Sequence, residues 1–388
     1  MKKIEFDAKP PTVKIAFFDV GQADTIVISC RETHEAIVVD CVDANAVLDY
    51  LEAEQITYLR GVIITHLHAD HYDKIAMLLN SYYHASNLQE CEVLAFNEIS
   101  KPKNFHKLEP DTDGHSSDYK KAEVGTKKTF PSSLANLVEW CKRNELKCAE
   151  IKVEKRPLPF EGTLVKAIQL VHPYLVDYFD LKTGSLNNTS VVLQVTGSGS
   201  SALLTGDLEP EGWLQLQKRH PDLRCDLLKF PHHGAWKSAD PGILLDTVKP
   251  SVTVISVGTE GEKYKHPNSH VFTALSKRHI RILCTQATNQ CHTSILNSRD
   301  RDAVIEKLKA QASTDGHQLI TSKSGCPCAG TVIIELGDKI HVIQPEINFH
   351  QENIIKHHFK SAKCNIDDIQ MINPIEKMQL DANLAEHL

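Results

Sequence analysis

The stretch GVIITHLHADH, residues 61–71, joins an apolar run to four side chains of the kinds that bind metal ions. The run GVIIT is typical of a buried strand. His66 and His68 are separated by one residue, so on an extended strand end both imidazoles point the same way. Asp70 and His71 follow in the turn that would begin the next helix. Imidazole with carboxylate is a ligand set that zinc prefers and that manganese and iron tolerate, so this stretch predicts a metal site.

The strand-like runs along the chain form two clusters. In the first cluster, residues 13–18, 25–29 and 36–40 are separated by turn residues and followed by a helical pattern at 44–54 and the strand that leads to His66. The second cluster holds LVKAIQLV, NTSVVLQV, SALLTGD, LLKFPHHG and SVTVISVG, all between residues 164 and 258. Two clusters of similar size predict an α/β fold with two packed mixed sheets and helices outside them.

The composition is that of a folded globular protein. Hydrophobic residues make up 41% of the 388 residues and charged ones 24%, which argues against disordered and fibrous classes. The net charge of −7 argues against a surface that is basic throughout, although a local basic patch remains compatible with it. The apolar runs are short, the first residues lack a secretory signal pattern, and 11 cysteines are typical of a reducing compartment. We therefore expect a cytoplasmic protein without a membrane span.

The expected main domain covers residues 11–345, ending with the strand GTVIIEL at 330–336 and its partner KIHVIQ. Residues 97–130 lose periodicity and gain lysine, proline and glycine, so they form either a lid that contacts substrate or a solvated surface loop. Residues 346–388 form a C-terminal tail whose role the sequence leaves open.

Further ligand-type residues follow two apolar runs downstream of His71. Asp207 comes after LLTG, and His232 and His233 come after LLKFP. Side chains at strand ends meet at one edge of a sheet, as a convergent site requires.

With these residues the sequence resembles the metallo-β-lactamase fold hydrolases, and most closely the soluble hydrolase domain of ComEC-type competence proteins and its stand-alone relatives. The resemblance extends over about residues 13–336. The matching motifs are FFDVGQADTIVI, VVDC, ITHLHADH, NNTSVVLQV, LLTGDLE, LLKFPHHG and VISVGTEGEKYKHPNS.

The resemblance implies an αββα sandwich with two divalent metal ions, zinc or manganese, at one edge. His66 and His68 would bind the first ion, and Asp70 and His71 the second. Asp207 would bridge both. One of His232 and His233 would complete the second site, and the sequence does not distinguish them. Water activated by two metal ions would then be the nucleophile, with Asp70 and Asp207 among the catalytic residues.

One part of the family's pattern is missing. Most members supply a third histidine to the first metal ion about twenty residues before the bridging aspartate, where this chain reads SLNNTS. Asn187 or Asn188 would offer a weak oxygen ligand or contact substrate there, water would fill the gap, or His172 would serve instead. The third histidine is also missing in the ComEC branch of the family, where its absence accompanies manganese-dependent nuclease activity.

Other motif residues are expected to line the cleft. From DVGQAD, the resemblance assigns Asp24 an acid-base role and Asp19 and Gln22 a place near substrate, whereas the alternative is a simple hairpin turn. His266 is either a leaving-group acid or part of a helix start, and Lys229 either contacts an anionic substrate or is solvated.

A second group of soft ligands lies late in the chain. Cys284, Cys291, His292, Cys326 and Cys328 would make a structural zinc site if their segments met, but their spacings are not a clean double CxxC, and ordinary reduced cysteines are the alternative.

The function that these motifs predict is a metal-dependent phosphodiesterase or nuclease acting on DNA or nucleotides. Seven lysines within residues 97–130 are consistent with a phosphate-bearing substrate. A hydrolase of small esters, lactones or thioesters is the alternative, because this fold changes substrate by changing loops. A third hypothesis is a subunit of a defence or DNA-uptake complex that docks protein partners through the tail.

Overall fold

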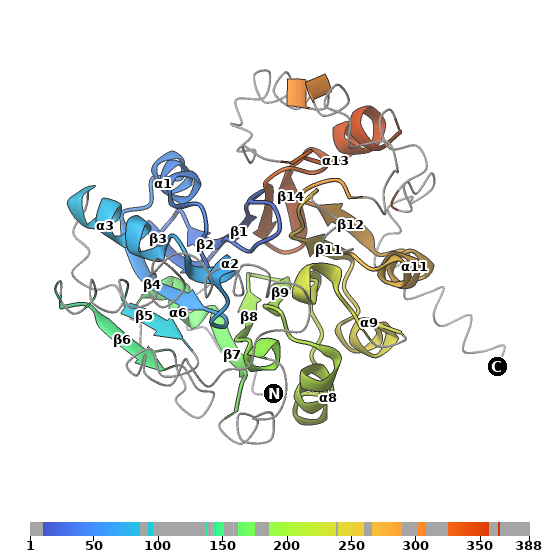
Figure 1. The fold of residues 1–388 in the computed structure, drawn as a ribbon, viewed down its shortest axis with the longest axis horizontal. Helices are drawn as coiled ribbons and strands as arrows, with labels where there is room; N and C mark the ends of the chain where they lie inside the picture. Colours follow the sequence, from blue (N-terminus) through green and yellow to red (C-terminus); the bar gives the residue numbers. More distant parts are fainter. Residues whose placement is uncertain are drawn as a thin grey trace, which may run out of the picture.

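The structure is a computed structural model that describes residues 11–85, 92–95, 145–150, 162–174, 186–237, 240–259, 266–288 and 325–356, with isolated positions between and beyond them (Figure 1). The predicted lid at 97–130 and most of the predicted tail lie outside these ranges. Residues 1–10 do as well.

An eight-stranded mixed sheet forms one half of the fold. Its strand order is β14-β13-β1-β2-β3-β4-β5-β6, antiparallel from β14 to β3 and parallel from β3 to β6. Its strands are β1 Val13–Phe17, β2 Ile26–Cys30, β3 Glu35–Val39, β4 Tyr58–Ile64, β5 Glu92–Ala95, β6 Lys147–Glu150, β13 Val332–Leu336 and β14 Ile340–Gln344.

A six-stranded mixed sheet forms the other half. Its order is β12-β11-β10-β9-β8-β7, parallel from β12 to β9 and antiparallel from β9 to β7. Its strands are β7 Ile168–His172, β8 Val192–Thr196, β9 Ser201–Leu204, β10 Leu227–Lys229, β11 Val252–Ile255 and β12 Arg281–Cys284.

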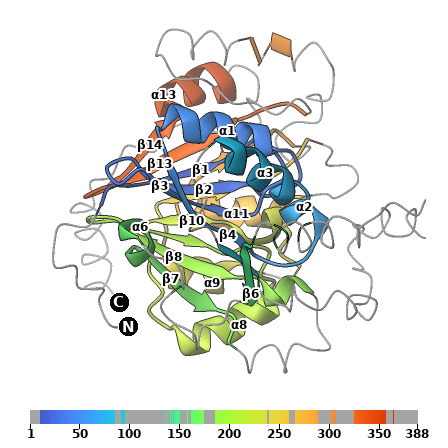
Figure 2. The ribbon, with the colours of Figure 1, turned by 90° about the vertical axis from the view of Figure 1, so that its left-hand side faces the viewer.

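Helices cover the outer faces of both sheets, as the two views of the ribbon show (Figures 1 and 2). On the side of the first sheet lie α1 Ala44–Ala53, α2 Ala69–Tyr72 and α3 Ile75–Ala85. On the side of the second lie α8 Pro210–Arg219, α9 Gly242–Val248 and α11 Ser269–Lys277. The remaining helical elements are α6 Thr163–Lys166, η2 Leu186–Thr189, η3 Pro231–Gly234, α13 Ile347–Phe349 and η4 His350–Ile355.

The alternation of side chains along each strand builds three apolar layers. In β1, Ile15 and Phe17 point into a core shared with Leu193 and Leu204 of the second sheet, while Ala16 packs on the opposite face with residues of α1 and α3. The outer face of the second sheet packs on α8, α9 and α11 in the same way. These layers confirm the predicted αββα sandwich of the metallo-β-lactamase type.

Two predicted strand boundaries were wrong at the start of the second cluster. Residues 164–166 are helical in α6, because the backbone N–H of Leu164 donates to Glu35 Oε2 (2.7 Å) and the chain enters the helix from Gly162 at φ +140°. The run NTSVVLQV becomes a strand only at Val192, because residues 186–189 form the turn η2. A short apolar run does not distinguish strand from helix by periodicity, so contacts distant in the sequence decided both boundaries.

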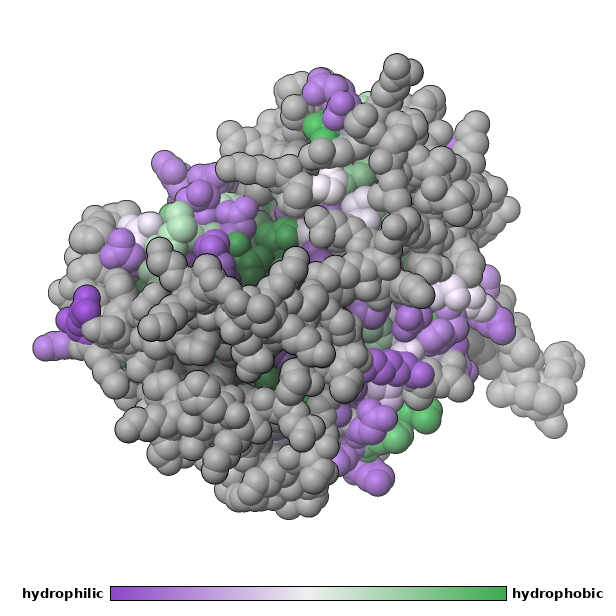
Figure 3. All heavy atoms as spheres, in the orientation of Figure 1, coloured by the Kyte–Doolittle hydropathy of each residue, from purple (hydrophilic) through white to green (hydrophobic). Residues whose placement is uncertain are grey.

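The surface of the described residues mixes polar and apolar side chains. On the face drawn in Figure 3, hydrophilic and hydrophobic residues lie beside one another. Among the described residues, the large apolar side chains that are exposed are Tyr58, Met77, Leu214 and Ile243. Among the helices that the structure describes, none combines the length and the apolar character needed to cross a bilayer.

Candidate metal centre

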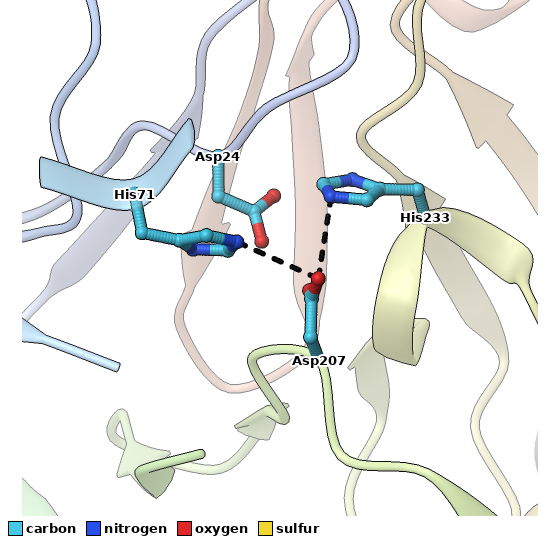
Figure 4. A group of neighbouring side chains, drawn as sticks. All are labelled: Asp24, His71, Asp207 and His233. Atoms are coloured by element: carbon cyan, nitrogen blue, oxygen red, sulfur yellow. Dashed lines mark ion pairs between the residues drawn. The ribbon is translucent and has the colours of Figure 1, made fainter. Parts of the chain in front are cut away.

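Four loops converge at one edge of the sandwich. They are the loop between β1 and β2, the segment after β4 that runs into α2, the turn after β9, and η3 after β10. Each brings one side chain to a common point, and the ligand atoms of Asp24, His71, Asp207 and His233 all lie within 4.8 Å of one another. Figure 4 shows the four side chains pointing toward this point. We call this group the Asp24 cluster.

The donor atoms of the Asp24 cluster fit a cation. Asp207 Oδ2 lies 3.5 Å from His71 Nε2 and 3.4 Å from His233 Nε2 (Figure 4). All four residues are buried, and His71 Nε2, His233 Nε2 and Asp24 Oδ1 have no hydrogen-bond partner among the described residues. Buried polar atoms are normally satisfied, and carboxylate oxygens with imidazole nitrogens are common ligands of divalent metal ions. A metal ion would satisfy these atoms together.

Asp40 fixes which nitrogen of His71 faces the cluster. Asp40 Oδ2 lies 2.6 Å from His71 Nδ1. Asp40 is itself held by Thr65, whose backbone N–H and hydroxyl donate to it at 2.8 and 2.7 Å. With Nδ1 engaged, Nε2 is left for the cluster, which is how histidine ligands are usually oriented. The sequence interpretation gave Asp40 no role, although VVDC was among the motifs that matched.

His233, rather than His232, points its ring into the cluster. His233 Nδ1 lies 2.8 Å from the carbonyl oxygen of Ser256, which directs Nε2 toward Asp207. The backbone of η3 makes this possible, since His232, His233 and Gly234 have φ of 50°, 52° and 82°. Three left-handed residues in succession form a tight turn, and such strain is found where function requires a special geometry.

His66 and His68 form a pair beside the cluster. His66 Nε2 and His68 Nδ1 are 2.9 Å apart, and the rings of His66 and His71 are 4.1 Å apart between centroids. Within the described part of the chain, no third ligand atom joins this pair within 4.8 Å. Asp70 Oδ1 lies 3.9 Å from His71 Nε2, and its side chain is 22% exposed. The structure therefore brings together the five ligand-type residues that HLHADH and LLTGD contribute. Of these five, only His71 and Asp207 belong to the Asp24 cluster.

Charge sets the protonation of the cluster. Burial lowers the pKa of His66, and His71 and His68 lower it further, so His66 is neutral. Burial also opposes protonation of His71, but Asp40, Asp207 and Asp70 outweigh it and raise the pKa of His71 well above 6.5. Burial raises the pKa of Asp207, but His233, His71 and Lys229 outweigh it, and that pKa lies well below 3.8. Asp207 is thus a carboxylate, as a metal ligand must be.

Lys229 lies inside the protein rather than at its surface. Its side chain is fully buried at the end of β10, and its ammonium donates to Asp24 Oδ2 and to the carbonyl oxygen of Gly206 (2.9 Å). It also lies 3.5 Å from Asp207 Oδ1. The alternative of a solvated lysine is excluded, and the predicted contact with substrate stays a prediction.

Asp19 and Gln22 connect the β1–β2 loop to other loops. Asp19 Oδ1 accepts a hydrogen bond from Gln286 Nε2 (2.6 Å), and Gln22 Oε1 accepts one from the backbone N–H of Gly258 (3.1 Å). These bonds tie the loop that carries Asp24 to the far sheet. Their predicted place near substrate stays a prediction.

Glu209 organises a second polar group next to the cluster. Its carboxylate accepts from Asn187 Nδ2 (3.3 Å) and Asn188 Nδ2 (3.4 Å). It also lies 3.7 Å from His232 Nδ1 and 3.5 Å from Lys237 Nζ. The sequence interpretation did not single out Glu209, although it follows the bridging aspartate in LLTGDLE.

Asn188, His172 and His266 surround these groups. Asn188 Oδ1 accepts from the backbone N–H groups of Glu209 (3.1 Å) and Gly212 (3.2 Å), so its oxygen caps α8. His172 Nδ1 lies 2.8 Å from the carbonyl oxygen of Ser190, and the rings of His266 and His232 are 5.7 Å apart between centroids.

The late cysteines are buried but do not assemble a metal site among the described residues. Cys284, Cys326 and Cys328 belong to no group of three ligand atoms within 4.8 Å, and Cys291 and His292 lie outside the described residues. Cys328 Sγ lies 3.5 Å from Nε2 of the buried His350. The structural zinc site stays a prediction.

Comparison with known proteins gives short matches. No protein-family model matches the chain. ComE operon protein 3 of Bacillus subtilis (strain 168) is 37% identical over 101 residues, which are 26% of this chain and 13% of that protein. The hydroxyacylglutathione hydrolase of Shewanella loihica (strain ATCC BAA-1088 / PV-4) is 48% identical over 58 residues, which are 15% of this chain and 22% of that enzyme. The chain therefore matches less than a quarter of the length of either relative.

A similar solved structure is that of the B3 metallo-β-lactamase BLEG-1. It is 17% identical, covers 60% of this chain and 82% of its own, and superposes with a TM-score of 0.31. A likeness this distant favours no particular substrate.

Proposed function

We propose that this chain is a metal-dependent hydrolase that cleaves phosphodiester bonds in DNA or nucleotides, because it has the metallo-β-lactamase fold and its sequence resembles ComEC-type proteins. The observation that carries the proposal is the Asp24 cluster, in which four buried ligand atoms lie within 4.8 Å of one another. Three of those residues offer an atom without any other hydrogen-bond partner among the described residues.

The proposed ligands of one divalent ion are His71, Asp207 and His233, with Asp24 as a fourth. The sequence resemblance adds a second ion at His66 and His68, but no third ligand atom among the described residues lies within 4.8 Å of that pair. A divalent metal ion in such a site supplies a Lewis acid that makes water a nucleophile at neutral pH and stabilises negative charge. Zinc and manganese both accept this ligand set.

The chain's own residues orient the ligands. Asp40 accepts a hydrogen bond from His71 Nδ1, and the carbonyl oxygen of Ser256 accepts one from His233 Nδ1, so both Nε2 atoms face the site. The nearby carboxylates raise the pKa of both rings, so each Nε2 would release a proton when a metal ion binds. The four residues of the Asp24 cluster are buried, whereas the neighbouring His68 and Asp70 are partly exposed, and we infer that substrate approaches from their side.

We propose that the group around Glu209 assists departure of the leaving group. His232 Nε2 is 4.0 Å from Asp207 Oδ2, and Glu209 faces its other nitrogen. A carboxylate beside an imidazole favours the protonated ring, which is the form that donates a proton to a departing oxygen. His266, which adjoins His232, is the second candidate for this acid.

A nucleic acid or nucleotide substrate is favoured by the sequence resemblance to ComEC-type proteins. ComE operon protein 3, a relative over part of the chain, is identical at 37% of the 101 matched positions. The hydrolysis of thioesters is the second candidate, because a hydroxyacylglutathione hydrolase is 48% identical over its shorter match. Protein partners at residues 346–388 and a cytoplasmic location remain part of the proposal.

The test is cleavage by the purified, metal-loaded chain. Single- and double-stranded DNA, cyclic dinucleotides and a glutathione thioester would each be incubated with Mn²⁺ or Zn²⁺. Asp207→Asn should lose at least about a hundredfold in rate if the site is the catalyst, whereas Asp338→Asn, a change outside the cluster, should not. Thioester turnover without phosphodiester turnover would transfer the proposal to the second candidate, and turnover of neither would refute it.

A further inference from the structure

We propose that Lys229 is a built-in counter-cation of the metal centre, which keeps the Asp24 cluster assembled before metal binds and weakens the binding of the metal itself. The inference rests on the proposed metal site. It adds to that site a residue whose charge sets how readily metal enters and leaves.

Lys229 contacts both carboxylates of the cluster. Its ammonium donates to Asp24 Oδ2 and lies 3.5 Å from Asp207 Oδ1. A third contact, to the carbonyl oxygen of Gly206 at 2.9 Å, holds it against the turn that precedes Asp207. The side chain is fully buried, so these groups replace its hydration.

In each carboxylate, one oxygen contacts Lys229 and the other faces the metal site. Asp207 gives Oδ1 to Lys229 and Oδ2 to His71 and His233. Asp24 gives Oδ2 to Lys229, and its Oδ1 has no hydrogen-bond partner among the described residues. Lys229 therefore fixes both side chains with one oxygen of each left for an ion.

The charges explain why a lysine stands here. Asp24 and Asp207 place two negative charges in a buried site, where unpaired charges strongly destabilise the fold. The ammonium offsets one of these charges, beside the imidazoles of His71 and His233, whose pKa values the nearby carboxylates raise, and it so helps the loops to meet without metal. The same positive charge repels an incoming divalent ion at short range, where the interaction is poorly screened. The positive charge of Lys229 thus both pairs with the carboxylates and repels the metal ion.

A direct role in binding substrate fits the contacts less well. Three oxygen atoms already surround the ammonium, and a fully buried lysine would have to break these contacts to reach a substrate outside. A lysine that only offsets the charge of the metal ligands does not need to move.

Lys229→Met tests the inference, because methionine fills a similar volume without charge. The apparent dissociation constants for Mn²⁺ and Zn²⁺ would be measured by competition with a chromophoric chelator, and the melting temperature with and without metal. We expect Lys229→Met to bind metal about tenfold tighter or more, because one unit of nearby positive charge is lost. Its metal-free form should melt below wild type, and saturating metal should restore most of the difference.

The double variant Asp24→Asn with Lys229→Met separates charge from shape. It restores the net charge of the wild-type site, so its metal-free form should melt above that of Lys229→Met, and its metal affinity should return to that of wild type or fall below it. Metal affinity in Lys229→Met that equals or is weaker than wild type would overturn the inference. So would a Lys229→Met chain that stays unfolded in saturating metal. Wild-type protein that binds no metal would refute the proposed metal site instead.

Discussion

At the scale of single residues, the orientation of His71 depends on a carboxylate that is not itself a member of the Asp24 cluster. Asp40 is fully buried and contacts His71 Nδ1 at 2.6 Å. Its other bonds come from Thr65, the residue directly before His66. The strand β4 and the end of β3 thus fix the ring between them.

Asp40→Asn should reduce metal affinity and turnover by about 10- to 100-fold, because an amide no longer selects the Nδ1–H tautomer of His71. Metal competition assays and initial rates would measure the change. Asp43→Asn is the matched control, since Asp43 caps α1 through a bond to the N–H of Ala46 (3.1 Å) and asparagine caps as well. Equal losses in both variants would show a general effect on folding.

His350 makes the stability of the fold depend on pH. Burial, together with the positive charge of Arg281, lowers its pKa to about 4. Because the pKa is lower in the folded state than in the unfolded one, the folded state takes up its proton less readily. The contribution to stability is therefore present above about pH 6.5 and is lost as the pH falls toward 4, by about 3 kcal/mol in total.

Replacing His350 by Gln should flatten this dependence. The free energy of unfolding, from urea titrations between pH 4 and 7, should fall less steeply with acid in the variant than in wild type. His341→Gln, on an exposed position of β14, should leave the slope unchanged. If the free energy of unfolding of His350→Gln falls with acid as steeply as that of wild type, His350 is not the source of the pH dependence.

At the scale of elements, the short η3 turn decides which histidine reaches the metal centre. Its left-handed backbone at residues 232–234 packs against Pro267, where a Cβ on Gly234 would overlap the ring. The turn thus joins β10 to the start of α11, and its shape depends on a residue without a side chain.

Gly234→Ala should cost about 1–3 kcal/mol of stability, because alanine is strained at φ +82° and its Cβ displaces Pro267. Turnover should fall with it, since His233 moves with the turn. Gly337→Ala is the control, because the nearest atom to a Cβ there is 3.6 Å away. Thermal unfolding and initial rates of both variants would decide, and a stable, active Gly234→Ala would contradict the role of the turn.

At the scale of the whole molecule, the last strands complete a sheet that the first strands begin. β13 pairs antiparallel with β1, from Val13 opposite Leu336 to Phe17 opposite Val332. Val332, Ile334 and Leu336 are fully buried in the core between the sheets. The fold therefore closes only when residues more than 300 positions apart meet.

Truncation after residue 330 should prevent folding, because the loss of three buried apolar side chains alone costs about 5 kcal/mol or more, comparable with the stability of an ordinary domain. Truncation after residue 356 keeps β13, β14, α13 and η4 and should leave a cooperative thermal transition. Circular dichroism and size-exclusion chromatography would compare the two. A folded shorter chain would show that β13 is dispensable.

The sequence predicted the sandwich because its evidence is local. The nearly continuous apolar run VKIAF marks a strand with two buried faces, and HLHADH carries its ligand types within six residues. The misplaced starts of β7 and β8 show the limit, because Glu35 and Glu209 reach those segments from elsewhere in the chain.

The sequence by itself determined the two sheets, their order of strands along the chain and the residue types of a metal site, since periodicity and spacing are properties of neighbouring residues. Only the tertiary structure decided that His233 faces the cluster, that Asp40 orients His71, and that Lys229 pairs with Asp24 across 205 positions. The physical reason is that a buried charge or ring nitrogen takes the partner that the packing of the two sheets brings near, and local spacing carries no record of that partner.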